Sequence, residues 1–433
     1  MTNITEIFIA GLVKKSQEIP HNVIQQACKV LLDYIGVLAG GKKYLKEKHP
    51  KLIASAPSEA FLNGFAAHVL ELDDGHRHGM IHLGASIVTA VLDVAEKENL
   101  KSDDVLRGIV MGYEVAVRCA RALQPGHKVR GYHVSGTCGT IGSAMGVAFA
   151  CGYNKEQLKS TLACAVSSAA GVLEIQEQAS ELKPYNVGRA AMAGVVAAQV
   201  GKLAMPGPDD ILGGKRGFLA ALTDTPKPEF LTDFKDEKYC IEGIYQKVHA
   251  ACRHCHPAID AMIDMRNDLD LRPEQIDRVE VRTYKLAVGS HDHTQIMGIS
   301  SAKLSTPYAV ALAIVKGSAG YADYNEANLE DDNIKMLTRK VSVVEDEKLT
   351  AQSPAVRGAR VIIYLKDGNV YEAPCLYPKG EPEHPLTQKE LEDKFRGLAM
   401  YGGLTHEECN KTIEEIGKKE FSINKIMNLI CKK

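Results

Sequence analysis

Two stretches of this chain, residues 139–150 and 161–172, consist mostly of Gly, Ala, Ser, Thr and Cys. Side chains this small let helices approach one another closely, so the two runs predict a tightly packed helix bundle. Their Gly and β-branched residues could also indicate buried strands, but both runs are longer than a typical strand. We therefore expect a mainly helical protein.

Apolar periodicity extends the helical prediction over the first third of the chain. After Pro20, a residue suited to the first turn of a helix, the apolar residues between Val23 and Leu38 fall on one face, and Gly40-Gly41 is expected to end this helix. Residues 85–95 indicate a buried helix, and Ser102 with the two Asp that follow is expected to cap the next one.

The pattern changes near residue 245. Four later segments have the composition of strands: 279–283, 341–344, 359–364 and 369–373. The last two flank Asp367-Gly368, a dipeptide that favours a tight hairpin turn. After Pro385 the helical periodicity returns, and we expect these last helices to pack on the first ones.

At 433 residues and 45% apolar, the chain can bury a core large enough for two or three structural units. We predict a protein that is mainly α with a smaller α+β domain. The large all-helical domain is expected to comprise residues 1–244 together with 379–433, and the α+β domain residues 245–378.

Composition excludes several classes of function. The formal net charge is -2 with no long block of one sign, so a nucleic-acid partner is not expected. No stretch approaches the roughly 18 consecutive apolar residues of a membrane span, and the N-terminal thirty residues do not resemble a signal peptide. Eleven scattered cysteines in a large chain indicate buried thiols in a reducing compartment, so we expect a cytoplasmic protein.

Four segments concentrate polar side chains that a hydrophobic core does not require: 63–82, 130–139, 183–189 and 247–256. The first carries Asp73, Asp74 and four His. The second is a Gly-rich turn before a small-residue run, where a helix N-terminus would offer N–H groups to a carboxylate. The third places Lys183 and Arg189 around a Pro and a Gly.

Each segment also has a purely structural interpretation. His68 lies three residues before Glu71 on an expected helix and is more readily explained as a buried structural His. Asp73 and Asp74 could cap a helix or form a turn as well as serve a site. Lys183 and Arg189 alone would ordinarily form a solvated face.

The fourth segment raises the question of a zinc site, through Cys252-x-x-Cys255 with His249, His254 and His256. A structural zinc site normally has a second ligand pair at a fixed spacing, and none follows here. His76, His78 and His82 could supply it only through folding. Four ligands from one helical stretch cannot surround one ion, because successive side chains are turned by about 100°. We therefore expect no metal.

Taken in order, these segments and others resemble the MmgE/PrpD family over nearly the whole chain. The resemblance is carried by eight motifs: NGFAAHVLELDD at 63–74, IHLGA at 81–85, GYHVSGTCGTIGSA at 131–144, KPYNVGRAAMAG at 183–194, LGGKRGF at 212–218, CRHCHPAIDA at 252–261, AKLSTPYAVALA at 302–313 and YPKGEP at 377–382. No single motif is decisive, but eight in the right order are specific for the family.

The resemblance implies a large helical domain built from both chain ends and a smaller α+β lid. It also implies a homodimer that acts without metal or organic cofactor. Known activities in the family are dehydration of 2-methylcitrate, decarboxylation of cis-aconitate and epimerisation of iminodisuccinate. In all of these, charge develops on a carbon next to a carboxylate, where cations and N–H donors stabilise it while an acid or base moves a proton.

Carried over residue by residue, the resemblance implies a set of site residues. His82, His133, Tyr308 and Asp74 match positions suited to proton transfer. The expected carboxylate-binding residues are Lys183, Lys247, Arg189 and Arg253. We expect His82, His133, Lys183, Lys247 and Tyr308 to line one cleft between the helical domain and the lid. Which residue acts as the base stays open.

Four residues depart from the family pattern. Asn186 stands where many members have His, Gly75 where the decarboxylases and many dehydratases have Thr, Cys252 where the decarboxylase has His, and Glu71 where Asp is usual. An amide cannot carry a proton as an imidazole does, so the substrate or reaction is expected to differ from that of the best-studied members. The decarboxylase interpretation suffers most.

We predict a lyase-type, dehydratase-like enzyme (a hydro-lyase) acting on a small di- or tricarboxylate related to 2-methylcitrate or aconitate. The alternatives are an epimerase or racemase of the iminodisuccinate type, a decarboxylase of the cis-aconitate type, and an inactive member that binds a carboxylate or a metal. A homodimer without membrane or nucleic-acid partners is expected.

Overall fold

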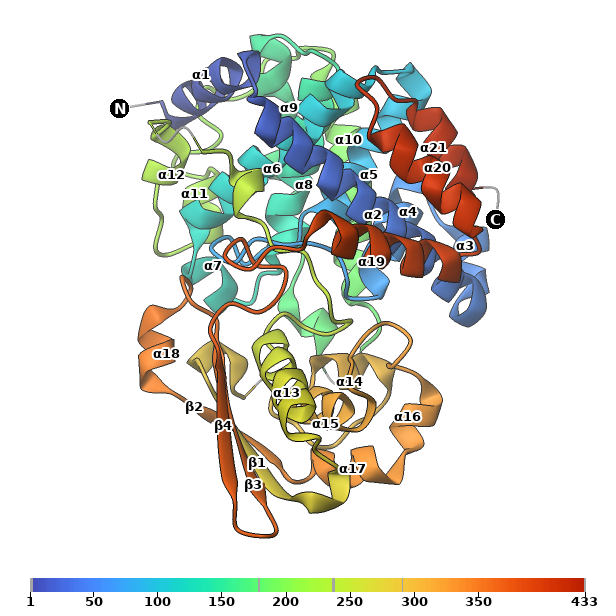
Figure 1. The fold of residues 1–433 in the computed structure, drawn as a ribbon. Coiled ribbons are helices and arrows are strands. Elements are labelled where there is room, and N and C mark those ends of the chain that lie inside the picture. The colour runs from blue at the N-terminus through green and yellow to red at the C-terminus, as the bar shows by residue number, and fades with distance from the viewer. Residues whose placement is uncertain (1–2, 178–179, 236–237, 290, 432–433) are drawn as a thin grey trace. The chain divides into compact units, whose positions relative to one another are not determined.

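The computed structural model describes residues 3–431 except 178–179, 236–237 and 290. The chain forms two compact units (Figure 1). The first unit comprises Met1–Ile175, Leu182–Tyr245 and Thr387–Lys433, and the second comprises Gln176–Glu181 and Gln246–Leu386. The predicted class, mainly α with a smaller α+β part, is confirmed. Residues 379–386 lie in the second unit, where Gln246 donates its N–H to the Gly380 carbonyl, although the sequence assigned them to the helical domain.

The first unit consists of helices and loops. Its N-terminal helices are α1 (Ile4–Gln17), α2 (His21–Lys48), α3 (Pro50–Ser55), α4 (Glu59–Val69), α5 (Gly84–Glu98), α6 (Ser102–Leu123), α7 (Gly126–Val129), α8 (Val134–Ala150) and α9 (Lys155–Ser167). They are followed by α10 (Lys183–Gly201), α11 (Phe218–Leu222) and α12 (Glu229–Thr232), and by the C-terminal helices α19 (Gln388–Tyr401), α20 (His406–Ile416) and α21 (Ile423–Cys431).

Helix α8 is the centre of this unit, and every residue in it is buried. It packs against α5, α6, α9 and α10. A Cβ atom on Gly112 of α6 would lie 2.9 Å from the Gly142 carbonyl oxygen of α8, so only glycine allows this approach. The close packing predicted from the first small-residue run is thus confirmed, whereas the second run is helical only as far as Ser167.

Local signals misplaced two helix ends. Gly40-Gly41 does not end α2, which continues to Lys48. A Cβ on Gly41 would lie 1.8 Å from the Ala66 carbonyl oxygen, so this glycine marks a helix crossing. Ser102 is the first residue of α6 rather than its cap, since the capping position is Lys101.

The C-terminal helices return to the first ones, as predicted. Helix α19 packs along α2. Lys394 Nζ lies 2.6 Å from the Asp33 carboxylate of α2 and donates to the Leu72 carbonyl oxygen at 2.9 Å. This buried ion pair therefore fixes α19, the first of the C-terminal helices, to α2.

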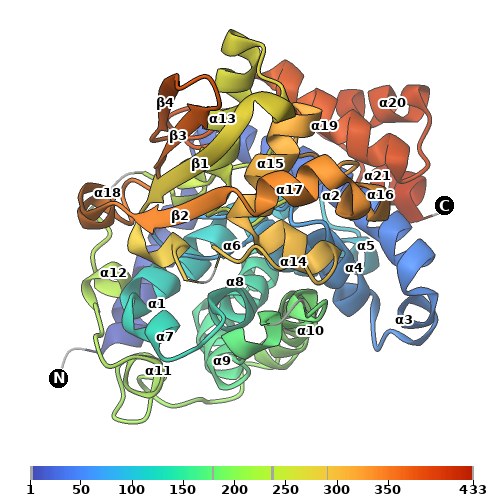
Figure 2. The same cartoon turned by 90° about the horizontal axis from the view of Figure 1, so that it is seen from below.

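The second unit contains a four-stranded sheet in the order β2-β1-β3-β4 (Figure 2). Its strands are β1 (Ile276–Thr283), β2 (Val341–Glu345), β3 (Ala359–Leu365) and β4 (Val370–Cys375), and its helices are α13 (His256–Leu269), α14 (Ile299–Leu304), α15 (Thr306–Lys316), α16 (Glu326–Glu330), α17 (Asp332–Thr338) and α18 (Glu347–Gln352). β1 and β2 are parallel and the other pairs antiparallel. The predicted strands and the Asp367-Gly368 hairpin are confirmed, with Gly368 at a φ of 91°.

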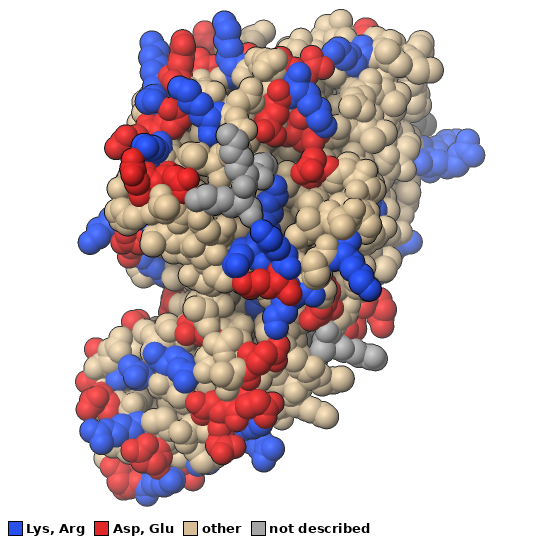
Figure 3. All heavy atoms as spheres, turned by 90° about the vertical axis from the view of Figure 1, so that its right-hand side faces the viewer, with Lys and Arg blue, Asp and Glu red and all other residues tan. Residues whose placement is uncertain are grey.

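One helix among the described residues, α2, is long and apolar enough to cross a membrane by length and composition. Of its most apolar window, 72% is buried inside the protein, as in the core helix of a bundle. On the face drawn in Figure 3, basic and acidic side chains are interspersed. This mixture agrees with the formal net charge of -2.

Candidate active site

The loop between α4 and α5 places a carboxylate between two imidazoles. Asp73 Oδ2 lies 2.8 Å from Nδ1 of His68 and 3.4 Å from Nδ1 of His82. His68 and Asp73 are buried, whereas 15% of the His82 side chain is exposed. His82 is therefore the member of this triplet that a ligand could reach.

The hydrogen bonds of His82 assign its tautomer. Its Nδ1 lies 3.1 Å from the backbone oxygen of Asp74, and a carbonyl oxygen only accepts hydrogen bonds, so Nδ1 carries the proton. The neutral ring then has its lone pair on Nε2. Burial alone would raise the pKa of Asp73, but the two histidines outweigh it and hold that pKa well below its usual range. An ionised Asp73 can stabilise the imidazolium that forms when Nε2 takes a proton.

Asp74 faces a different environment from that of its neighbour. One carboxylate oxygen accepts from the Tyr113 hydroxyl at 2.6 Å and the other from the Gly84 N–H, at the start of α5, at 2.7 Å. Burial raises the pKa of Asp74 to about 7, although both hydrogen bonds act to lower it. Asp74 therefore caps α5, and Asp73 is the carboxylate that faces the histidines.

Glu71 and Lys183 form a close buried ion pair. Lys183 is the first residue of α10, and Glu71 follows α4 with a φ of 57°. A non-glycine residue in this left-handed conformation costs about 1 kcal/mol or more, so the surrounding structure must fix it. The cation that we expected to bind a substrate carboxylate thus already has a carboxylate partner.

His133 is held as a neutral ring by Asn186. The Asn186 side-chain NH2 contacts His133 Nδ1 at 3.1 Å and donates to the Val172 carbonyl oxygen at 3.3 Å. Because the carbonyl only accepts, this orientation of the amide is fixed, and Nδ1 of His133 must also accept. Burial, reinforced by the charge of Lys183, holds the pKa of His133 well below its usual range. The ring therefore presents an Nε2–H donor.

Arg189 serves the backbone. Its guanidinium donates to the carbonyl oxygens of Ser168, Gly136 and Ala170. These bonds fix the end of α9 and the segment after it to α8 and α10. We infer that Arg189 shapes the site rather than contacting a ligand.

Two predicted cations, Lys247 and Arg253, lie in the second unit. The Lys247 side chain is fully buried. Arg253 forms a close, buried ion pair with Glu381. Both charges are thus held inside this unit, and their role in ligand binding stays a prediction.

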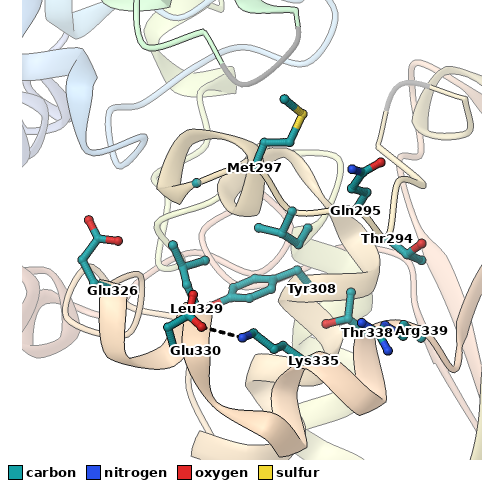
Figure 4. Close-up of a pocket in the computed structure, with 12 residues that line it drawn as sticks. Thr294, Gln295, Met297, Tyr308, Glu326, Leu329, Glu330, Lys335, Thr338 and Arg339 are labelled. Atoms are coloured by element: carbon teal, nitrogen blue, oxygen red, sulfur yellow. Dashed lines mark hydrogen bonds and ion pairs between the residues drawn. The ribbon is translucent and has the colours of Figure 1, made fainter.

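Tyr308 lies in the first turn of α15 and lines a pocket of about 630 Å³ within the second unit (Figure 4). Its hydroxyl is buried and has no hydrogen-bond partner among the described residues. Burial raises the pKa of this hydroxyl. The pocket also carries the Glu330–Lys335 ion pair, with an Oε2–Nζ distance of 2.6 Å. The role of Tyr308 in proton transfer stays a prediction.

In the 249–256 segment, three of the residues considered as zinc ligands each have a partner of their own: His249, Cys255 and His256. His249 Nε2 lies 2.6 Å from Asp260 Oδ1, and His256 Nε2 lies 3.2 Å from the Ala251 carbonyl oxygen. Cys255 Sγ accepts a hydrogen bond from the Thr306 hydroxyl at 3.4 Å. The ligand set considered from the sequence does not gather around one point.

Comparison with known protein families gives two matches in chain order. Residues 49–231 match the MmgE/PrpD N-terminal domain, and residues 249–418 match the MmgE/PrpD C-terminal domain. The chain belongs to the MmgE/PrpD family. The resemblance inferred from the eight motifs is confirmed.

Similar proteins within the family share low identity over most of their length. The chain is 24% identical to the cis-aconitate decarboxylase-like protein oryM of Aspergillus oryzae, over 89% of this chain and 88% of that protein. It is 24% identical to the cis-aconitate decarboxylase of Homo sapiens, over 92% of this chain and 88% of that protein. The mouse cis-aconitate decarboxylase is 23% identical.

One departure from the family pattern has a structural explanation. Gly75 exchanges two backbone hydrogen bonds with Tyr245, and a Cβ at position 75 would lie 2.3 Å from the Tyr245 hydroxyl oxygen. A Thr here would have to displace the Tyr245 ring. The change at Gly75 is therefore linked to the presence of Tyr245.

Sequence reasoning missed three partners in this MmgE/PrpD site. Asp73 was weighed only as half of an acidic pair, and Tyr113 lies on α6, far from Asp74 in the sequence. Glu71 was noted as a departure, without its pairing to Lys183. Only the Asp73-Asp74 dipeptide offered a signal, since adjacent residues of a loop point in different directions.

Proposed function

We propose that the chain is a lyase that removes water from a small di- or tricarboxylate, with His82 as the base. The observation that carries this proposal is the contact of the ionised Asp73 with His82, a partly exposed histidine whose neutral ring carries its lone pair on Nε2. A base of this kind, oriented and stabilised by a carboxylate, suits abstraction of a proton next to a carboxylate.

Each neighbouring group has a part in the proposed step. His82 Nε2 takes the proton from the carbon next to a substrate carboxylate. The Nε2–H of His133 and the ammonium of Lys183 stabilise negative charge that develops on the substrate oxygens. The His82 imidazolium then gives its proton to the departing hydroxyl group, so that water leaves, an alkene remains and the enzyme regains its starting protonation state.

Decarboxylation is the second candidate, and the named relatives favour it. Three similar proteins are called cis-aconitate decarboxylases or decarboxylase-like. In that reaction the carbon–carbon bond breaks, carbon dioxide leaves, and an imidazolium at His82 protonates the remaining carbanion. Cys252, which stands where the decarboxylase has His, supports dehydration instead.

The experiment is a thermal-shift screen of small di- and tricarboxylates, followed by turnover of each stabilising compound in heavy water. Binding raises the melting temperature by mass action. Loss of the hydroxyl without carbon dioxide supports dehydration. Release of carbon dioxide supports the second candidate, and deuterium uptake at an intact hydroxy acid supports an epimerase. No stabilising polycarboxylate would refute the substrate class. We further propose a cytoplasmic homodimer, to be checked by light scattering and fractionation.

A further inference from the structure

A second cluster of ligand-type side chains lies within the second unit. Cys252 and His254 precede helix α13, and His291 lies in the loop before α14. One potential ligand atom from each of the three residues lies within 4.8 Å of the other two. The His254 and His291 rings are stacked, with centroids 4.8 Å apart. The cluster thus joins two segments that are distant in the sequence.

The hydrogen bonds of His291 aim a lone pair at the thiol. Its Nδ1 lies 2.9 Å from the Leu304 carbonyl oxygen, which only accepts, so Nδ1 carries the proton. The neutral ring then has its lone pair on Nε2, which lies 3.6 Å from Cys252 Sγ. His254 Nδ1 lies 2.6 Å from the buried Tyr284 hydroxyl, which accepts from this ring when Nδ1 carries the proton and leaves the Nε2 lone pair for an ion. Such outer hydrogen bonds orient histidines that ligate metals.

The sulfur–nitrogen separation has the size that a shared ion requires. A zinc ion lies about 2.3 Å from a thiolate and about 2.0–2.1 Å from an imidazole nitrogen, and a tetrahedral angle then separates the two ligand atoms by about 3.5–3.6 Å. The observed distance of 3.6 Å fits this arrangement. A thiol–imidazole hydrogen bond fits the same distance, but it does not require the third ring.

We propose that Cys252, His254 and His291 bind one divalent ion of the zinc type, with the fourth position left to water or a ligand oxygen. One sulfur and two nitrogens are donors that zinc accepts. Binding converts the Cys252 thiol to a thiolate and releases one proton to solvent. Arg253, the nearest cation in sequence, is paired with Glu381 and does not add an uncompensated charge.

This site is distinct from the set suggested by Cys252-x-x-Cys255. Cys255 is buried against Thr306, and His291 takes the place that a second thiol would have had. The proposal stands independently of the proposed lyase activity, because every ligand and supporting residue belongs to the second unit.

The test is a cobalt titration of the purified full chain after dialysis against a strong chelator. Cobalt bound by a thiolate gives a charge-transfer absorption that oxygen and nitrogen ligands do not give. We expect about one cobalt per chain with this absorption, displaced by zinc. Cys252→Ser should remove the absorption, and His291→Asn and His254→Asn should abolish stoichiometric binding. Tyr284→Phe should weaken binding by about 10-fold or more through the lost support of His254.

Cys255→Ser is the matched control, since it removes the other thiol of the same motif and should retain the absorption. The proposal is overturned if the wild-type chain binds no cobalt, if it binds cobalt without the thiolate absorption, or if the absorption survives in Cys252→Ser. Should the variants fail to fold, X-ray absorption on the cobalt-loaded wild type decides the question. One sulfur and two imidazoles support the site, and a shell of oxygen and nitrogen alone refutes it.

Discussion

In the first unit, ligand atoms of His68, Asp73 and His82 lie within 4.8 Å of one another, and in the second unit those of Cys252, His254 and His291 do the same. The two clusters differ in which ring atoms converge. In the first, the Nδ1 atoms of both histidines face the Asp73 carboxylate, and His82 Nδ1 also donates to a carbonyl. In the second, the unprotonated Nε2 of His291 faces a thiol.

This difference separates a proton-transfer group from a metal site. In the first cluster both Nδ1 atoms face a carboxylate as hydrogen-bond donors, which leaves Nε2 of His82 as the unprotonated nitrogen of a base. A lone pair aimed at a thiol offers two donors to one ion. Residue type alone does not distinguish the two cases. The hydrogen bonds that the histidines make to groups outside each cluster do distinguish them.

The largest expected effect is on turnover, from His82→Gln. Loss of a positioned general base should lower kcat by about 10²–10⁴-fold. Cobalt binding in the second unit should be unchanged in the same variant, which separates the two clusters. His21→Gln, at the exposed start of α2, is the control. Steady-state kinetics check this, and near wild-type kcat would remove His82 from the mechanism.

Lys183→Ala should affect both stability and turnover. It leaves Glu71 as a buried carboxylate without its ammonium partner, and breaking a buried pair costs about 3–5 kcal/mol. Adding Glu71→Gln should restore the melting temperature but not turnover, because the lysine that is proposed to bind the substrate is still missing. A double variant with normal kcat/KM would show that Lys183 is purely structural.

Asp74→Asn should change the pH dependence of stability. The pKa of Asp74 in the folded chain is about 7, above its ordinary value of 3.8, so ionisation of Asp74 destabilises the folded state as the pH rises from about 4 through 7. Asn cannot ionise. The variant should therefore gain stability over the wild type across this range, by up to roughly 4 kcal/mol at about 1.4 kcal/mol per pKa unit. Melting temperatures at several pH values measure the difference, and a constant difference would contradict it.

The smallest expected effect comes from Lys247→Met, which keeps most of the buried volume and removes the charge. A lost charge-assisted hydrogen bond of about 1.5–3 kcal/mol should lower kcat/KM by about 10- to 100-fold. Lys285→Ala, an exposed lysine of the same unit, is the control. If kcat/KM in the Met variant equals that of the control, the second unit does not supply this cation to the substrate.

Much of the fold could be predicted because its signals are local. The small-residue runs, the alternating strands and the Asp367-Gly368 turn all depend on side chains a few positions apart. The helix end predicted at Gly40-Gly41 was wrong. Gly41 allows α2 to pass close to Ala66, and no local pattern reveals such a contact. The family followed from ordered motifs, whereas the site roles of His82, His133 and Lys183 stay predictions.

The sequence by itself determined which ionisable groups are present and which elements carry them. Tertiary structure decided which partner each group meets: Asp73 rather than Asp74 against the histidines, Glu71 on Lys183, Asn186 on His133 and His291 beside Cys252. The physical reason is that a carbonyl, amide or carboxylate a few ångströms away fixes the protonated nitrogen of a ring and the charge of a carboxyl. Those neighbours come from distant parts of the chain.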